Sequence, residues 1–143
     1  MKISERLPAI FVIAFLVLGV GIMGWRFFGS SETSAEVSVK VPPLSAPAQK
    51  GKLAYDSNCV ACHGANGAGS EQGPPLVHDI YNPGHHADEA FIRATRFGVR
   101  QHHWRFGNME PQPQISFEEI VAIIKYIREL QRANGIFYKP HRM

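Results

Sequence analysis

Hydrophobic residues recur at helical spacing in the C-terminal part of the chain, and no segment shows the strict alternation of a β-strand. The clearest stripe follows the i, i+3, i+4, i+7 pattern of an amphipathic helix and consists of Ile120, Ile123, Ile124, Ile127 and Leu130. Ser116 and Glu119 have the spacing of a capping box, and Asn134-Gly135 supplies a C-terminal stop. The pattern predicts a core helix over about 117–133.

Two further helices are predicted upstream. One covers about 49–59 and includes Leu53, Ala54 and Tyr55, with Gly51 one turn before Tyr55. The other begins near Asp88 as a helix cap and ends at Gly98. With three helices and no strand, residues 49–138 are expected to form a small all-α domain, followed by a short tail at 139–143.

The N-terminal residues 1–29 have a different character. From Leu7 to Trp25 the sequence contains 19 residues without a charge, which as a helix would span about 28 Å, close to the apolar thickness of a bilayer. Lys2 and Arg6 precede this run, so the positive-inside rule puts the N-terminus in the cytoplasm. We interpret the segment as a single transmembrane signal-anchor; a cleaved secretory signal is the alternative.

Residues 30–48 are rich in serine, threonine, valine and proline. Pro42, Pro43 and Pro47 are expected to interrupt any regular element there. The sequence therefore predicts a linker between the anchor and the helical domain, which would reach about 59 Å if fully extended.

The chain has two cysteines, and both lie in Cys59-Val60-Ala61-Cys62-His63. This spacing is typical of covalent attachment of one c-type haem, in which each thiol binds a vinyl group and His63 becomes the proximal iron ligand. A thioredoxin-like redox pair would require a βαβ context, and a zinc site would require two further ligands at ordered spacing. Neither context is present, so haem c is the predicted cofactor.

A six-coordinate haem iron needs a second axial ligand. Of the four methionines, Met109 is the only one inside the predicted domain. A thioether favours reduced iron and raises the redox potential, as suits an electron carrier. We therefore predict Met109 as the distal ligand. A histidine in its place would lower the potential, and an open position would favour gas binding or peroxidase chemistry.

Five histidines lie between His78 and His103. The pairs His85-His86 and His102-His103 are candidates for a copper or zinc site, because imidazole suits both metals. Adjacent residues rarely direct both side chains to one ion, so we favour polar loop residues, one of whose rings could bond to a haem propionate. Further propionate partners are the donors of Arg100, Trp104 and Arg105.

The net charge of the chain gives little information about its binding partners. The formal net charge is +3, and from residue 49 onward there are 11 Lys and Arg residues against 9 Asp and Glu. Four arginines cluster in sequence, as a basic docking patch or a solvated helix face: Arg93, Arg96, Arg100 and Arg105. No basic-aromatic module for nucleic acid is present, and no small-molecule substrate is expected.

Over residues 49–135 the chain resembles a class I monohaem c-type cytochrome of the bacterial, membrane-anchored kind. The resemblance rests on the haem motif together with Gly73-Pro74-Pro75-Leu76, Phe106-Gly107-Asn108-Met109 and the last helix around Tyr126–Gln131. It implies that the Pro74 carbonyl accepts the ring N–H of His63 and that Leu76 packs on the porphyrin.

The resemblance also implies that the first and last helices of the domain cross closely, with Gly51 and Tyr55 against the face around Tyr126. One departure is Met109-Glu110-Pro111, where relatives often carry a proline directly after the distal methionine. This places a carboxylate beside the expected haem edge without removing the ligand.

The function implied is one-electron transfer rather than catalysis. The haem domain would lie on the periplasmic side of a bacterial inner membrane and carry electrons between membrane redox complexes that act as donor and acceptor. Two alternatives remain open, namely a haem c subunit of an oxidase or dehydrogenase complex and a small haem peroxidase.

Overall fold

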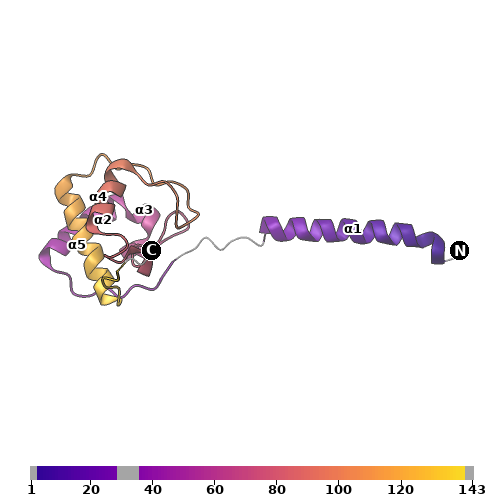
Figure 1. The fold of residues 1–143 in the computed structure, drawn as a ribbon, viewed down its shortest axis with the longest axis horizontal. Coiled ribbons are helices and arrows are strands. Elements are labelled where there is room, and N and C mark those ends of the chain that lie inside the picture. Colours follow the sequence, from indigo (N-terminus) through magenta and orange to yellow (C-terminus); the bar gives the residue numbers. More distant parts are fainter. Residues whose placement is uncertain (1–2, 29–35, 141–143) are drawn as a thin grey trace. The chain divides into compact units, whose positions relative to one another are not determined.

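The computed structural model describes residues 3–28 and 36–140, and the chain divides into two compact units (Figure 1). The first unit contains one helix, α1 (Ile3–Phe28). Its described apolar side chains are exposed, with Phe11 and Phe15 more than two-thirds accessible. Within the described part of the chain, no helix combines the length and apolarity needed to cross a membrane. The predicted transmembrane anchor is therefore not confirmed.

The second unit is helical, as predicted. Its α-helices are α2 (Ala46–Asn58), α3 (Val60–His63), α4 (Asp88–Phe97) and α5 (Phe117–Ala133). Two 3₁₀ turns, η1 (Ala65–Gly67) and η2 (Asp79–Tyr81), lie in the loops between them. Among the described residues, β-pairing is limited to one isolated bridge between Val99 and Met109.

Helix α5 is the centre of the core. The predicted stripe is buried, with Ile120, Ile127 and Leu130 at most 1% exposed. Both halves of the capping box are present, since the Ser116 hydroxyl accepts from the Glu119 N–H and the Glu119 carboxylate accepts from the Ser116 N–H. The helix ends at Ala133, before Asn134. Hydrophobic period and caps therefore predicted this element correctly.

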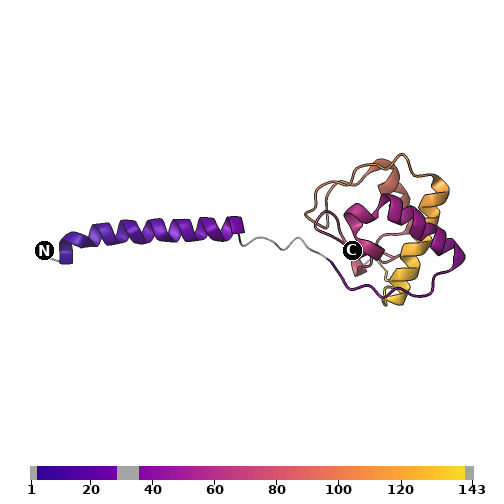
Figure 2. The ribbon, with the colours of Figure 1, turned by 180° about the vertical axis from the view of Figure 1, so that it is seen from behind.

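Helices α2 and α5 pack against each other, as both views of the ribbon show (Figure 2). At their contact a Cβ on Gly51 would lie only 1.9 Å from the Ala122 carbonyl oxygen, so the backbones meet where there is no side chain. The rings of Tyr55 and Tyr126 are edge-to-face with centroids 5.5 Å apart. The close crossing that the resemblance implies is present.

The start of the helical unit differs from the prediction. Helix α2 begins at Ala46, with Ser45 as its cap and Pro47 in its first turn, where no backbone N–H is needed. Upstream, the Val37 N–H bonds to the Ala68 carbonyl at 2.8 Å, and Lys40 exchanges two hydrogen bonds with the Asn134 side chain. The segment predicted as linker up to residue 48 is thus part of the packed unit from residue 37.

Two smaller boundaries also shift. Helix α4 begins at Asp88, which was predicted to be its cap. The cap position is held by Ala87, whose side chain makes no capping hydrogen bond. Asp88 instead accepts from Arg128 Nε at 2.8 Å. Lys139, expected to begin a tail, bonds to the Asp79 carboxylate at 2.6 Å and to the Asn82 side chain.

Candidate haem site

The Cys59–His63 motif folds as a single turn at the end of α2. Cys59 ends α2 and precedes α3, and its carbonyl accepts from the N–H of Cys62 and of His63 at 3.2 and 2.9 Å. Both thiols are free of disulfides, with Cys62 exposed and Cys59 half-buried. Burial, with the neighbouring Cys62, raises the pKa of Cys59 to about 11. The motif therefore presents two thiols and one imidazole within a single turn of the chain.

The imidazole of His63 is oriented by the backbone. Its Nδ1 lies 2.9 Å from the Pro74 carbonyl oxygen, which is the hydrogen bond that the resemblance implies. Because a carbonyl only accepts, Nδ1 carries the proton and Nε2 keeps its lone pair. Burial lowers the pKa of His63, although the Pro74 bond works in the opposite direction. A neutral ring with a fixed Nε2 is the form that binds a metal.

The glycine-rich loop after the motif brings Pro74 to this position. Gly64 has a φ of +71°, and a Cβ there would lie 2.0 Å from the Gly69 carbonyl oxygen. The Gly69 N–H returns to the His63 carbonyl at 2.8 Å, and the Leu76 N–H bonds to the Gly67 carbonyl at 2.8 Å. The loop therefore folds back on the motif and carries residues 74–76 beneath it.

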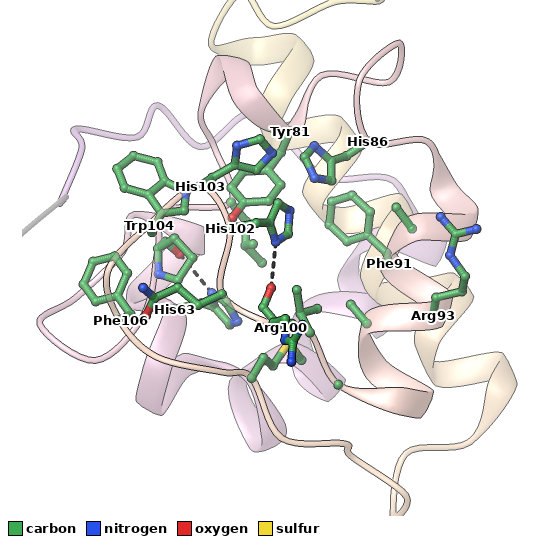
Figure 3. Close-up of a pocket in the computed structure, with 18 of the residues that line it drawn as sticks. His63, Tyr81, His86, Phe91, Arg93, Arg100, His102, His103, Trp104 and Phe106 are labelled. Carbon is green, nitrogen blue, oxygen red and sulfur yellow. Dashed lines mark hydrogen bonds between the residues drawn. The ribbon is translucent and has the colours of Figure 1, made fainter.

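His63 lines a cavity of about 500 Å³ that also contains Met109, Pro74, Leu76 and Trp104 (Figure 3). This volume is within the range of small-molecule and cofactor sites. Met109 is held by a reciprocal pair of backbone hydrogen bonds with Val99, at 2.9 and 3.0 Å. The chain thus brings the two predicted axial ligands, far apart in sequence, to the same cavity.

Trp104 supplies an unpaired donor to this cavity. Its indole Nε1 is buried and has no hydrogen-bond partner among the described residues. Burial raises the pKa of Tyr81 to about 12, and the nearby Trp104 indole acts in the opposite direction. The two groups do not form a hydrogen bond. A buried N–H without an acceptor costs folding free energy, and a carboxylate of a cofactor would supply an acceptor.

Arg105 was predicted as another cofactor contact, but it is exposed and outside the cavity lining. The structure instead adds Tyr81, Phe91 and Arg93, which sequence reasoning did not assign there. Three residues of the histidine pairs, considered as propionate contacts, also line the cavity, namely His86, His102 and His103. Arg100, considered as a propionate partner, does line the cavity.

The rings of the two histidine pairs lie closer to each other than the sequence alone indicates. His85, His86 and His103 each place one ring nitrogen within 4.8 Å of the others. These residues belong to two loops, so their proximity depends on tertiary structure and no spacing in the sequence indicates it. The interpretation of the four histidines as polar loop residues stays a prediction.

The residues present fit a covalently attached haem. The two thiols adjoin an imidazole whose Nε2 is available, a thioether lies on the same cavity, and the buried Trp104 N–H lacks an acceptor. The lining also includes apolar side chains such as Leu76 and Phe91 that a porphyrin would cover.

Comparison with known proteins agrees with this geometry. The family model described as Cytochrome c matches residues 48–131. The chain is also similar to the Cbb3-type cytochrome c oxidase subunit FixP of Bradyrhizobium diazoefficiens, with 33% identity over 100 residues. The match covers 64% of this chain and 33% of that protein, so the chain spans about a third of the length of this curated relative.

Proposed function

Because the chain belongs to the cytochrome c family and carries haem c, we propose that it transfers single electrons through one haem with His63 and Met109 as axial ligands. The observation that carries the proposal is that both side chains line one cavity, and that the two thiols belong to the same turn as His63. The haem supplies the Fe(II)/Fe(III) couple, and His/Met ligation sets a high potential.

The protein's own residues have separate roles in this proposal. Cys59 and Cys62 bind the cofactor covalently, and the Pro74 carbonyl fixes the orientation of His63. The bridge to Val99 fixes the backbone of Met109. Trp104 donates to a propionate. None of these groups takes part in bond-making on a substrate, so the proposal is a carrier and not a catalyst.

Spectroelectrochemical titration of the haem-loaded full chain tests the ligation. The wild type is expected to show the far-red Met–Fe(III) absorption band and no ligand binding by ferrous haem at neutral pH. Met109→His should remove the band and lower the midpoint potential by more than about 0.1 V, within the roughly 0.8 V range that axial ligands control.

Met23→Leu is the matched control, because Met23 lies in α1 and outside the haem unit. It should leave the band and the potential unchanged. A high-spin ferric spectrum in the wild type, or a Met109→His variant that keeps both band and potential, would exclude Met109 as the ligand. The first result, together with peroxide turnover, would instead favour the small peroxidase.

A second candidate function is a haem subunit of a respiratory oxidase, which is favoured by the similarity to an oxidase subunit. The two functions differ in the stability of the complex. A carrier should purify alone from gentle detergent, whereas a subunit should co-purify with other redox proteins in fixed stoichiometry. Haem and metal content of the purified sample decides between them.

From the sequence, we also propose that residues 1–29 tether the haem unit to a bacterial inner membrane with the haem on the periplasmic side. The support is the uncharged run from Leu7 to Trp25 and the positive residues before it. Membrane fractionation with alkaline extraction tests this. The protein should stay in the membrane fraction, and its intact mass should include the N-terminal segment. A soluble, shortened protein would indicate a cleaved signal.

Leu16→Arg places a charge at the middle of the run and should reduce membrane retention, since arginine at the centre of a span costs about 2.5–3.5 kcal/mol. Ser34→Arg, outside the run, is the control and should be retained like the wild type. Equal retention of both variants would count against a spanning segment.

A further inference from the structure

A cluster of imidazoles lies at one side of the haem cavity. His85 Nε2 and His103 Nε2 are 3.2 Å apart, and His86 completes a set whose ring nitrogens all lie within 4.8 Å of one another. Two ligands of one tetrahedral ion with metal–nitrogen bonds of 2.0–2.1 Å would be about 3.3–3.4 Å apart. The 3.2 Å between the Nε2 atoms of His85 and His103 is close to this value.

The two adjacent residues converge because the chain turns tightly before them. The Asn82 carbonyl accepts from the N–H of both His85 and His86, at 3.0 and 2.9 Å. This turn places their rings nearly perpendicular, with centroids 4.6 Å apart. The objection that neighbouring histidines rarely serve one ion applies to regular elements and does not hold for this turn.

The ring of His86 has the proton arrangement of a metal ligand. Its Nδ1 lies 2.8 Å from the Ile80 carbonyl oxygen, so Nδ1 carries the proton and Nε2 is unprotonated. A histidine ligand commonly donates its second N–H to a backbone carbonyl, which fixes the tautomer and the ring orientation. His86 is already oriented in this way without an ion.

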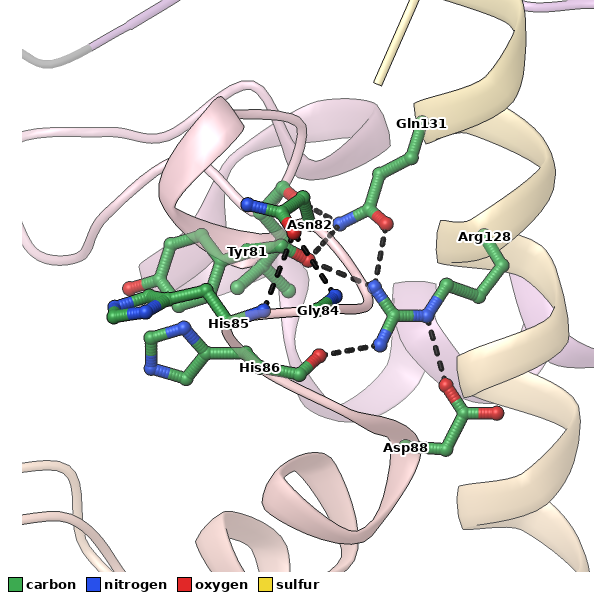
Figure 4. Close-up of polar contacts among 9 residues, drawn as sticks. Tyr81, Asn82, Gly84, His85, His86, Asp88, Arg128 and Gln131 are labelled. Carbon is green, nitrogen blue, oxygen red and sulfur yellow. Dashed lines mark hydrogen bonds and ion pairs between the residues drawn. The ribbon is translucent and has the colours of Figure 1, made fainter. Parts of the chain in front are cut away.

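The loop that bears His85 and His86 is rigidly supported (Figure 4). The buried guanidinium of Arg128 donates to the carbonyls of Tyr81 and His86, at 2.7 and 2.5 Å. The Asn82 side chain accepts from the Gly84 N–H at 2.9 Å and from the His85 N–H at 3.2 Å. These bonds hold both histidines before any ligand arrives, which reduces the ordering cost of binding.

The cluster also favours neutral rings. Burial lowers the pKa of His86, and the charges of His85, His102 and Arg128 act in the same direction, although the hydrogen bond to the Ile80 carbonyl opposes them. The pKa of His103 is lowered by burial and by the three neighbouring histidines. Neutral imidazoles have the lone pairs that a metal requires.

We propose that His85, His86 and His103 bind one divalent transition-metal ion beside the haem cavity. Three imidazoles suit Zn²⁺ and Cu²⁺, and a water would complete four-coordination. His102 is not part of the proposed site, because its ring nitrogens fall outside the set of close ring atoms. The alternative is that the His85–His103 contact is only a hydrogen bond between neutral rings.

Zinc binding to the full-length, haem-loaded protein tests the proposal, because Zn²⁺ is redox-inactive and does not obscure the haem. After chelator treatment, calorimetric titration with Zn²⁺ should give one zinc per haem. Zinc-edge X-ray absorption should show three imidazole nitrogens at about 2.0–2.1 Å. His85→Gln and His103→Gln should each weaken the affinity more than 10-fold.

His102→Gln is the matched control, since it removes a neighbouring imidazole from the same loop and should change the affinity less than 3-fold. The haem absorption spectrum confirms that each variant is folded. Because His103 is exposed, the His103→Gln variant keeps the test available if His85→Gln unfolds the loop.

Three outcomes would overturn the proposal. They are the absence of stoichiometric zinc binding, an equal loss of affinity in the His102→Gln variant, and an altered axial-ligand spectrum in the His85→Gln or His103→Gln variant. The last would show that the cluster serves the haem iron and not a separate ion. The first two outcomes leave the proposal of His63 and Met109 ligation unaffected, whereas the third would also count against Met109 as the distal ligand.

Discussion

Two buried tyrosines support the loop that follows the haem motif. The Tyr55 hydroxyl donates to the Gly64 carbonyl at 2.7 Å, and the Tyr126 hydroxyl donates to Asn66 Oδ1 at 2.8 Å. Asn66 has a φ of +56°, the only positive value among the described non-glycine residues. The Tyr126 bond therefore helps to hold a residue in the left-handed conformation, which costs energy for a side chain other than glycine.

Tyr126→Phe removes one hydroxyl and keeps the ring. Burial raises the pKa of Tyr126 to about 12, above its ordinary value of about 10. The folded state thus holds this proton more tightly, and the stability it contributes is present below about pH 10 and lost as the pH rises toward 12. In the Phe variant, we expect the free energy of unfolding at pH 8 to fall by about 1 kcal/mol and to depend less on pH above 10.

Denaturant titrations of the haem-loaded protein between pH 8 and 12 measure both effects. Tyr138→Phe is the control, because Tyr138 is 68% exposed and its loss should change neither quantity. An unchanged alkaline slope in Tyr126→Phe would assign the effect to other groups.

At the scale of elements, helices with local signals were predictable and positions set by long-range contacts were not. Helix α5 carries its stripe and its caps in its own sequence. The start of α2 was predicted too late because Pro47 breaks a helix interior but is compatible with a first turn. The packing of residues 37–45 depends on partners such as Asn134 and Glu129 that lie about ninety residues away in sequence, so composition alone indicated a linker.

Gly51→Ala tests the contact between α2 and α5. The new Cβ would lie 1.9 Å from the Ala122 carbonyl oxygen and 2.4 Å from its carbon. Backbone atoms cannot move aside as a side chain can, so the helices must separate. We expect a loss of about 3 kcal/mol or more in the free energy of unfolding, measured by thermal and denaturant unfolding of the haem-loaded protein.

Lys52→Ala provides the comparison on the same helix. Lys52 pairs with Asp56 one turn later at a partly exposed position, and such pairs contribute about 0.3–0.5 kcal/mol. A Gly51→Ala variant as stable as Lys52→Ala would show that the helices have room to adjust.

At the scale of the whole haem unit, Arg128 connects the last helix to the loop beside the cavity. It is 6% exposed and donates to Asp88, Tyr81, His86 and Gln131. Local reasoning predicted the motif residues Cys59, Cys62 and His63, and elimination among methionines predicted Met109. Their roles stay predictions, although His63 and Met109 line the same cavity. The histidine cluster and this arginine became visible only when α5 and two loops were brought together in three dimensions.

Arg128→Lys keeps the charge but loses the planar arrangement of five donors. The His86 carbonyl would then lose its donor, and the Tyr81 carbonyl would keep only the one from Gln131. We expect a decrease of about 2–3 kcal/mol in the free energy of unfolding. If the loop is held by these bonds, zinc affinity should fall as well. Arg132→Lys, on the exposed side of α5, should change stability by less than about 0.5 kcal/mol. Equal stability of the two variants would contradict this role for Arg128.

The contacts between residues 37–45 and α5 have a consequence for the order of folding. Lys40 pairs with Asn134 across 94 residues and Ser45 with Glu129 across 84. Contacts of such separation form late, because the intervening chain must first be closed into a loop. The domain is therefore incomplete until its final helix has been synthesised and released. During that interval Cys59 and Cys62 remain on an open chain, which gives the haem-attachment step access to both thiols before the core closes behind them.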